Sequence, residues 1–179
     1  MKKFICILMV LVMALGMTAV LGGCKSYDSE INVFNWGENI SDGTDGAMDV
    51  IAEFEEKYNI KVNYTTYETN EELYSILSSS NSSYDIVIPS DYMIEKLIAE
   101  DLLTEINFDN IPNYANIGDT YKNLAFDPDN KFSVPYTWGV VALCYNKTMV
   151  NSQEIKGFSD LWNENLKGNI LMIDNSRDA

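Results

Sequence analysis

Three short clusters of polar and aromatic side chains carry the residue types that could do chemistry in this sequence. They lie at residues 36–39, 90–92 and 174–178, and the first two directly follow segments whose patterns predict strands. Together they combine carboxylates with the rings of Trp36 and Tyr92. A cation with an aliphatic body needs carboxylates for its charge and aromatic faces for its methylenes. The clusters therefore point to an organic cation, although each member taken alone is also an ordinary surface or packing residue.

The charge of the chain excludes several classes of function. It has 27 acidic and 12 basic residues, no histidine and a net charge of -15. Such a protein suits a cationic partner and disfavours nucleic acid, whose phosphates need basic patches. The lack of histidine removes histidine-based catalysis and most zinc sites. No nucleotide-binding, nucleophile-elbow or Cys/His metal motif is present, so we expect no catalytic residue, no metal and no cofactor.

The segments that must position the first two clusters alternate between strand and helix patterns. The order β-α-β-α-β-α predicts an α/β fold with a mainly parallel sheet, in which ligands sit at the carboxyl ends of the strands. We expect strands at residues 31–35, 61–67 and 85–89, and helices at 47–58, 70–80 and 93–100.

The second half of the sequence is less regular. Residues 107–130 predict loops, followed by strands at 132–136, 140–145 and 169–174 and a helix at 158–166. Cys144 has no partner for a disulfide and is predicted to be a buried apolar residue. The acid pairs Glu55-Glu56 and Glu71-Glu72 are predicted to be solvated on helix faces. Because the sequence stops soon after its last predicted strand, we expect a fragment of a longer protein.

The N-terminus predicts an export signal. Lys2 and Lys3 precede an uncharged, mostly apolar run over residues 4–23, and Cys24 follows two glycines as in a bacterial lipoprotein lipobox. We expect cleavage before Cys24, lipidation of its sulfur and a short tether at 24–30, with an uncleaved membrane anchor as the alternative. Removing residues 1–23 leaves 27 acidic and 10 basic residues, a net charge of -17.

Several short motifs occur in an order that is typical of one family. They are Asn35-Trp36 with Glu38, and residues 64–71, 84–92, 126–128, 134–139, 159–162 and 174–178. From residue 31 to residue 179 the chain resembles the spermidine/putrescine-binding proteins of bacterial ABC importers. A series of motifs in the right order is more specific than any one of them.

The resemblance implies a type II periplasmic-binding-protein fold, in which two α/β lobes trap a ligand between them. Residues 31–136 would form the first lobe, and residues 137–179 the crossover and an incomplete second lobe. It also implies a polyamine ligand, permease subunits of an ABC importer as partners, and no enzymatic activity. We further expect a monomer, held by a lipid on Cys24 at the outer face of the cytoplasmic membrane or in the periplasm.

The resemblance also assigns ligand-binding residues, and two of them depart from the family pattern. Asn39 stands where spermidine binders usually carry tyrosine, and Asn175 where they usually carry aspartate. Two alternatives therefore stay open: a same-fold protein for another organic cation or an amino-acid derivative, and a surface hydrolase with paired carboxylates. The absence of histidine and of a nucleophile motif weighs against the hydrolase. The predicted ligand-binding residues are Trp36, Glu38, Asn39, Ser90, Tyr92, Asn175, Ser176, Arg177 and Asp178.

Overall fold

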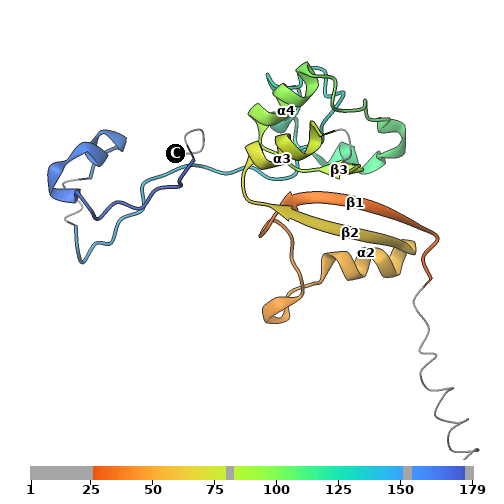
Figure 1. The fold of residues 1–179 in the computed structure, drawn as a ribbon, viewed down its shortest axis with the longest axis horizontal. Coiled ribbons are helices and arrows are strands. Elements are labelled where there is room, and N and C mark those ends of the chain that lie inside the picture. The colour runs from red at the N-terminus through yellow and green to blue at the C-terminus, as the bar shows by residue number, and fades with distance from the viewer. Residues whose placement is uncertain (1–25, 80–82, 151–154, 176–179) are drawn as a thin grey trace, which may run out of the picture. The chain divides into compact units, whose positions relative to one another are not determined.

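The computed structural model describes residues 26–79, 83–150 and 155–175 (Figure 1). The chain divides into two compact units. The first comprises Met1–Thr66 with Ser83–Val87, and the second comprises Tyr67–Ser82 with Ile88–Ala179. The lobe boundary expected at residue 136 stays a prediction.

The predicted β-α-β order is confirmed by a small sheet. Strands β1 (Ser29–Trp36), β2 (Ile60–Tyr67) and β3 (Ile86–Val87) lie in the order β2-β1-β3. β1 and β3 are parallel neighbours, with Val33 opposite Ile86 and Phe34 opposite Val87. Both strands therefore end at the same edge of the sheet. The core lies along β1, where the ring of Phe34 is buried and stacks on Tyr84 at 4.5 Å between centroids.

Helix α2 (Val50–Tyr58) connects β1 to β2 and begins three residues later than its apolar spacing predicts. The reason is Asp49, whose extended backbone and carboxylate cap the helix by accepting a hydrogen bond from the Ala52 amide at 2.9 Å. At its other end Asn59 adopts a left-handed conformation (φ 53°) that stops the helix and turns the chain into β2.

The second unit is built around two helices, α3 (Asn70–Leu77) and α4 (Asp91–Ala99). Thr69 caps α3, and Glu71 and Glu72 occupy its first turn, where negative charge suits the helix dipole. The core of this unit is apolar and lies between the helices. It contains Tyr67, Leu73, Met93 and Leu97, each no more than 3% exposed.

Short 3-10 turns and one buried carboxylate organise the loops after α4. The turns are η2 (Phe108–Asn110), η3 (Pro112–Asn116) and η4 (Asp119–Tyr121). Asp127 accepts hydrogen bonds from the backbone amides of Lys131, Phe132 and Ser133 at 2.9–3.0 Å and from the Ser133 hydroxyl at 2.7 Å. Burial alone would raise the pKa of Asp127, but these hydrogen bonds outweigh it and lower the pKa.

The strands expected at 132–136, 140–145 and 169–174 are wrong, because these segments have no regular secondary structure. A strand forms only beside another strand that pairs with its backbone, and among the described residues no strand pairs with these segments. The helix expected at 158–166 forms instead as two 3-10 turns, η5 (Phe158–Trp162) and η6 (Glu164–Leu166). The prediction of a buried Cys144 is also wrong, since its side chain is exposed.

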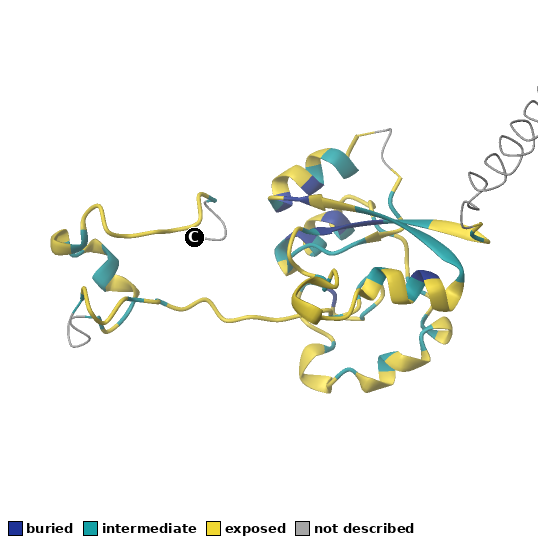
Figure 2. Cartoon of the chain, turned by 90° about the horizontal axis from the view of Figure 1, so that it is seen from below, coloured by how far each residue is buried: buried dark blue, intermediate teal, exposed yellow. Residues whose placement is uncertain are grey.

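Burial is concentrated in the sheet and in helices α3 and α4 (Figure 2). After Asp127, none of the described residues is buried. In the part of the chain that the structure describes, no helix has the length and apolar character needed to cross a bilayer. The predicted signal at 1–23 and Cys24 lie outside the described residues.

Candidate functional site

The first predicted cluster begins where β1 ends. Asn35 is buried, and its side-chain oxygen accepts a hydrogen bond from the Trp36 amide at 2.8 Å. The Tyr64 hydroxyl of β2 donates to the Trp36 carbonyl at 3.4 Å. The backbone of Trp36 is thus fixed from both sides while its ring is half-buried, and Glu38 and Asn39 follow in an exposed turn. This arrangement presents an aromatic face and a carboxylate at the edge where β1 ends.

The second predicted cluster is organised by a residue that sequence reasoning used only as a helix start. Asn70, the first residue of α3, is 0% exposed. Its amide nitrogen donates to the Ser90 hydroxyl at 3.0 Å and to the Tyr92 hydroxyl at 2.9 Å. Its oxygen accepts from the Ser90 backbone amide at 3.1 Å. Ser90 and Tyr92 are therefore brought together through one buried side chain.

The orientation of the Asn70 amide follows from its neighbours. A backbone N–H can only donate, so the atom of Asn70 that faces the Ser90 amide must be the oxygen. The NH₂ group then faces the two hydroxyls, which must accept from it. The hydrogens of both hydroxyls are directed away from Asn70, toward other acceptors.

The position of Ser90 raises the question whether its side chain only caps the following helix. It stands at the N-cap of α4, where a serine side chain commonly caps the helix. Its side chain makes no capping hydrogen bond, although its carbonyl accepts from the Met93 and Ile94 amides at 3.0 Å. The hydroxyl is engaged by Asn70 instead.

Glu71 lies beside this cluster, and its prediction as a merely solvated residue is incomplete. It is exposed, but its carboxylate accepts a long hydrogen bond from the Tyr92 hydroxyl at 3.5 Å. Its other oxygen accepts from the side-chain amide of Asn175 at 3.1 Å. An acid thus contacts two predicted site residues in the second unit.

The third predicted cluster is only partly described. Asp174 is exposed and Asn175 contacts Glu71, whereas Ser176, Arg177 and Asp178 lie outside the described residues. Their assignment as ligand-binding residues stays a prediction.

The prediction that Glu55 is solvated on a helix face is wrong. It is only 9% exposed and accepts hydrogen bonds from the Tyr27 hydroxyl at 2.6 Å and from the Val62 amide at 2.9 Å. Lys61 lies 3.2 Å from the same carboxylate. The hydrogen bond from Tyr27, helped by Val62 and Lys61, lowers the pKa of Glu55 to about 2. Glu55, on α2, thus binds Tyr27 and two residues of β2, and it is a structural residue.

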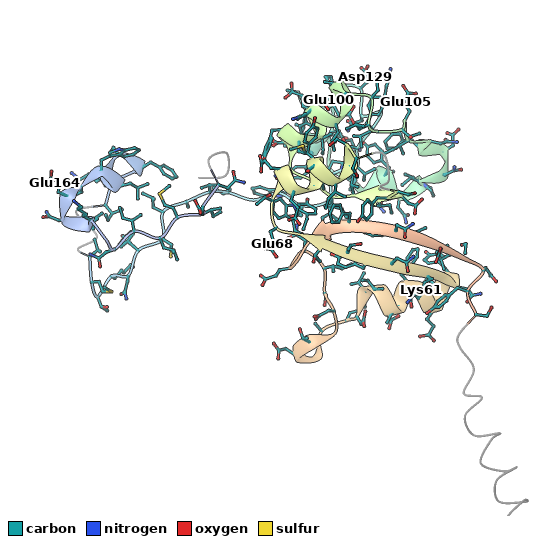
Figure 3. The ribbon with its side chains drawn as sticks, viewed as in Figure 1. Lys61, Glu68, Glu100, Glu105, Asp129 and Glu164 are labelled. Carbon is teal, nitrogen blue, oxygen red and sulfur yellow. The ribbon has the colours of Figure 1, made fainter. Side chains whose placement is uncertain are left out.

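The remaining charged side chains are spread over the surface. Figure 3 shows five acids that the structure leaves exposed, namely Glu68, Glu100, Glu105, Asp129 and Glu164. Among the residues that the structure describes, no three acids or cysteines gather into a group that could hold a metal ion. The acidic residues therefore supply a broad negative field rather than a single focus.

Comparisons with known proteins identify relatives of this chain. The chain is 32% identical over 168 residues to the spermidine/putrescine-binding periplasmic protein of Escherichia coli, an alignment that covers 93% of this chain and 46% of that protein. It thus spans about half the length of this curated relative.

Solved structures show the same fold. A spermidine/putrescine ABC transporter substrate-binding protein, PotD from Streptococcus pneumoniae, is 39% identical with a TM-score of 0.63, covering 69% of this chain and 36% of that one. The TpPotD lipoprotein of Treponema pallidum is 31% identical with a TM-score of 0.54, covering 60% of this chain and 32% of that one. The chain therefore has part of a type II periplasmic-binding-protein fold, as expected.

The family follows from a direct match. Residues 49–179 match the family described as bacterial extracellular solute-binding protein. This match covers well over half of the chain and includes β2, β3, α3 and α4. The chain belongs to the bacterial extracellular solute-binding protein family.

Proposed function

We propose that this protein binds spermidine or putrescine outside the cytoplasmic membrane and delivers it to an ABC importer. The observation that carries the proposal is the similarity, over 93% of this chain, to a relative named for binding these two polyamines. The chemistry of the predicted site is consistent with it. Polyamines carry ammonium groups separated by methylenes, which is the combination that carboxylates and aromatic faces recognise.

The ligand-binding residues are proposed as two groups. Trp36 ends β1 and Glu38 and Asn39 follow it, while Ser90 and Tyr92 come after β3. Both groups lie close in the chain to the parallel strands β1 and β3, and ligands of such sheets bind at the carboxyl ends of the strands. The third group, Asn175, Ser176, Arg177 and Asp178, would come from the second lobe and supply the carboxylate of Asp178.

Capture rather than catalysis is the proposed mechanism. The lobes that begin at residues 31 and 137 close on the polyamine, with carboxylates pairing its ammoniums and Trp36 and Tyr92 covering its methylenes. The closed form docks on the permease, and an ATPase drives release inward. No step forms or breaks a covalent bond in the ligand. The protein acts as a monomer in this cycle.

The charge of the protein would speed the encounter. After removal of residues 1–23 a net charge of -17, carried in part by exposed acids such as those labelled in Figure 3, attracts a polycation over several ångströms. Salt screens this attraction with a Debye length of about 8 Å at physiological ionic strength. The association rate should therefore fall as salt rises.

We also propose that a lipid on Cys24 holds the protein beside its permease. The sequence around Cys24 supports this, and a solved relative from Treponema pallidum is named a lipoprotein. One acyl chain binds a membrane only marginally, so a diacyl anchor is expected. Mass spectrometry of the membrane fraction should find a modified Cys24, and Cys24→Ala should leave the protein unprocessed or shed. An unmodified Cys24 in that fraction contradicts the proposal.

A second ligand class is favoured by two residues. Asn39 stands where a polyamine would contact a tyrosine ring, and Asn175 where it would pair with an aspartate, so fewer groups are available to interact with the ammonium groups. A different organic cation or an amino-acid derivative would suit such a site. This alternative shares the fold and the capture mechanism.

Titration calorimetry on the full-length protein tests the function. Spermidine and putrescine should bind reversibly with no new product, and Trp36→Ala should weaken binding by ~1–2 kcal/mol through lost cation–π contact. Asp178→Ala should cost ~2–5 kcal/mol, because it removes one partner of a desolvated charge pair. Glu56→Ala, an exposed acid on α2, is the matched control and should leave affinity within about twofold. Absence of heat with any polyamine, or equal effects of all three substitutions, contradicts the assignment.

A further inference from the structure

We propose that Asn70 is a positioning residue for the ligand site, one that prearranges Ser90 and Tyr92 without contacting the ligand itself. This inference rests on the proposed function. It is motivated by the number and destination of the hydrogen bonds that Asn70 makes. All three go to Ser90 or Tyr92, and the side chain is 0% exposed.

The position of Asn70 is itself rigid. It is the first residue of α3, and the preceding Thr69 caps this helix by accepting from the Glu72 amide at 3.1 Å. One turn on, Leu73 is completely buried in the core. A side chain placed on a capped and packed helix end has little freedom, so it can serve as a fixed reference for a neighbouring loop.

The segment that Asn70 holds is fastened at a second point. The Tyr67 hydroxyl donates to the Ile88 carbonyl at 2.6 Å, two residues before Ser90. The connection between β3 and α4 is therefore hydrogen-bonded at two points, at Ile88 by a residue from the end of β2 and at Ser90 by a residue from the start of α3. Of these two points, only Ser90 is a predicted ligand-binding residue.

The polarity of these hydrogen bonds decides what the site presents. Because the hydroxyl oxygens of Ser90 and Tyr92 both accept from Asn70, each hydroxyl hydrogen points away from the Asn70 amide, and that of Tyr92 is donated to Glu71 at 3.5 Å. The Ser90 oxygen keeps a second lone pair, which can accept from an ammonium N–H. Asn70 thereby sets both the place and the direction of two hydroxyls before the ligand arrives.

Loss of this arrangement should weaken binding, because the site would no longer be preorganised. Without Asn70 the Tyr92 ring and the Ser90 hydroxyl can adopt other rotamers, and the ligand must order them as it binds. The apolar core formed by Tyr67, Leu73, Met93 and Leu97 does not depend on these hydrogen bonds. We therefore expect a folded protein with reduced affinity.

A double-mutant cycle in the full-length protein, with spermidine as the probe in titration calorimetry, tests the inference. Asn70→Ala should weaken binding about tenfold and Tyr92→Phe about threefold, as expected for the loss of a few hydrogen bonds. If Asn70 acts through Tyr92, the double variant should be about tenfold weaker rather than about thirtyfold. A residue with a merely structural role would show no such coupling.

Asn63→Ala is the matched control. Asn63 also makes two side-chain hydrogen bonds, to Glu30 at 3.3 Å and Asn32 at 3.1 Å, and neither partner is a predicted site residue. It should leave affinity within about twofold. Should Asn70→Ala fail to fold, Asn70→Ser, which can keep one hydrogen bond, replaces it in the cycle with a smaller expected loss and the same coupling.

Two results would overturn the inference and are distinct from a failure of the proposed function. One is wild-type affinity in the Asn70 variant, and the other is full multiplication of the separate Asn70 and Tyr92 effects. A wild-type protein that binds no polyamine would overturn the proposed function and this inference together. Sub-multiplicative loss with an unaffected Asn63 variant supports the positioning role.

Discussion

Two regions of the chain, residues 26–136 and residues 137–175, have similar apolar patterns but differ in how far their apolar side chains are buried. In the first region Phe34, Leu73 and Leu97 are no more than 1% exposed, whereas in the second Trp162 is 82% and Leu171 is 98% exposed. The difference lies in the neighbours: β1 has a strand on each side, and the segment at 169–174 has none among the described residues. An apolar pattern thus states what a segment can bury, while tertiary partners decide whether it does.

The largest expected effect comes from comparing one leucine in each region. Leu73→Ala removes a fully buried side chain and should lower the free energy of unfolding by ~2–5 kcal/mol. Leu171→Ala should change it by less than about 0.5 kcal/mol, because that side chain is already exposed. Urea titration of the same chain measures both, and equal losses would break the comparison.

A smaller effect is expected at Asp127, near the end of the first region. Asp127→Asn removes the carboxylate that accepts from three amides and one hydroxyl, and it should cost about 2–3 kcal/mol. Asp129→Asn, an exposed neighbour, is the control. Since folding lowers the pKa of Asp127, its contribution to stability is present above the ordinary aspartate range and is lost as pH falls through the lowered value. An unchanged urea midpoint for Asp127→Asn would contradict this account.

The smallest effect concerns the start of the first region. The pKa of Glu55 falls from its ordinary 4.5 to about 2 on folding, so its stabilising effect is complete above 4.5 and is lost as pH drops from 4.5 toward 2. Glu55→Gln should flatten the pH dependence of the melting temperature in that window, and Tyr27→Phe should do so in part. Glu56→Gln, exposed on the same helix, should leave the profile unchanged. Identical profiles for all variants would show that the contact with Tyr27 contributes nothing.

Local patterns sufficed to predict the strands and helices of residues 29–100, apart from the exact ends of several of them. The β1 strand, the end of β2 at Tyr67 and the start of α3 at Asn70 all follow from side-chain periodicity and capping chemistry. The placement of Trp36 at the end of β1 and of Ser90 shortly after β3 followed from the same reasoning. These features depend on residues close in sequence, so a single sequence contains them.

The features that were missed depend on residues far apart in the chain. Asn70 meets Ser90 across 20 positions, and Glu55 meets Tyr27 across 28. Neither pairing leaves a periodic signal, because asparagine at a helix start and glutamate on a helix face are both common on their own. The strands predicted at 132–136, 140–145 and 169–174 were wrong for a related reason: their pairing partners were assumed, and none occurs in the part of the chain that the structure describes.

Hydrogen exchange on the full-length protein, with and without spermidine, tests the proposal that residues 36–39 and 88–92 take part in polyamine binding. The account predicts slow exchange in β1, β2 and α3 in both states. It predicts added protection on spermidine binding in peptides that cover 36–39 and 88–92. A control titration with sodium chloride at matched ionic strength separates binding from screening. Protection that stays the same in both peptides when spermidine is added would contradict the claim.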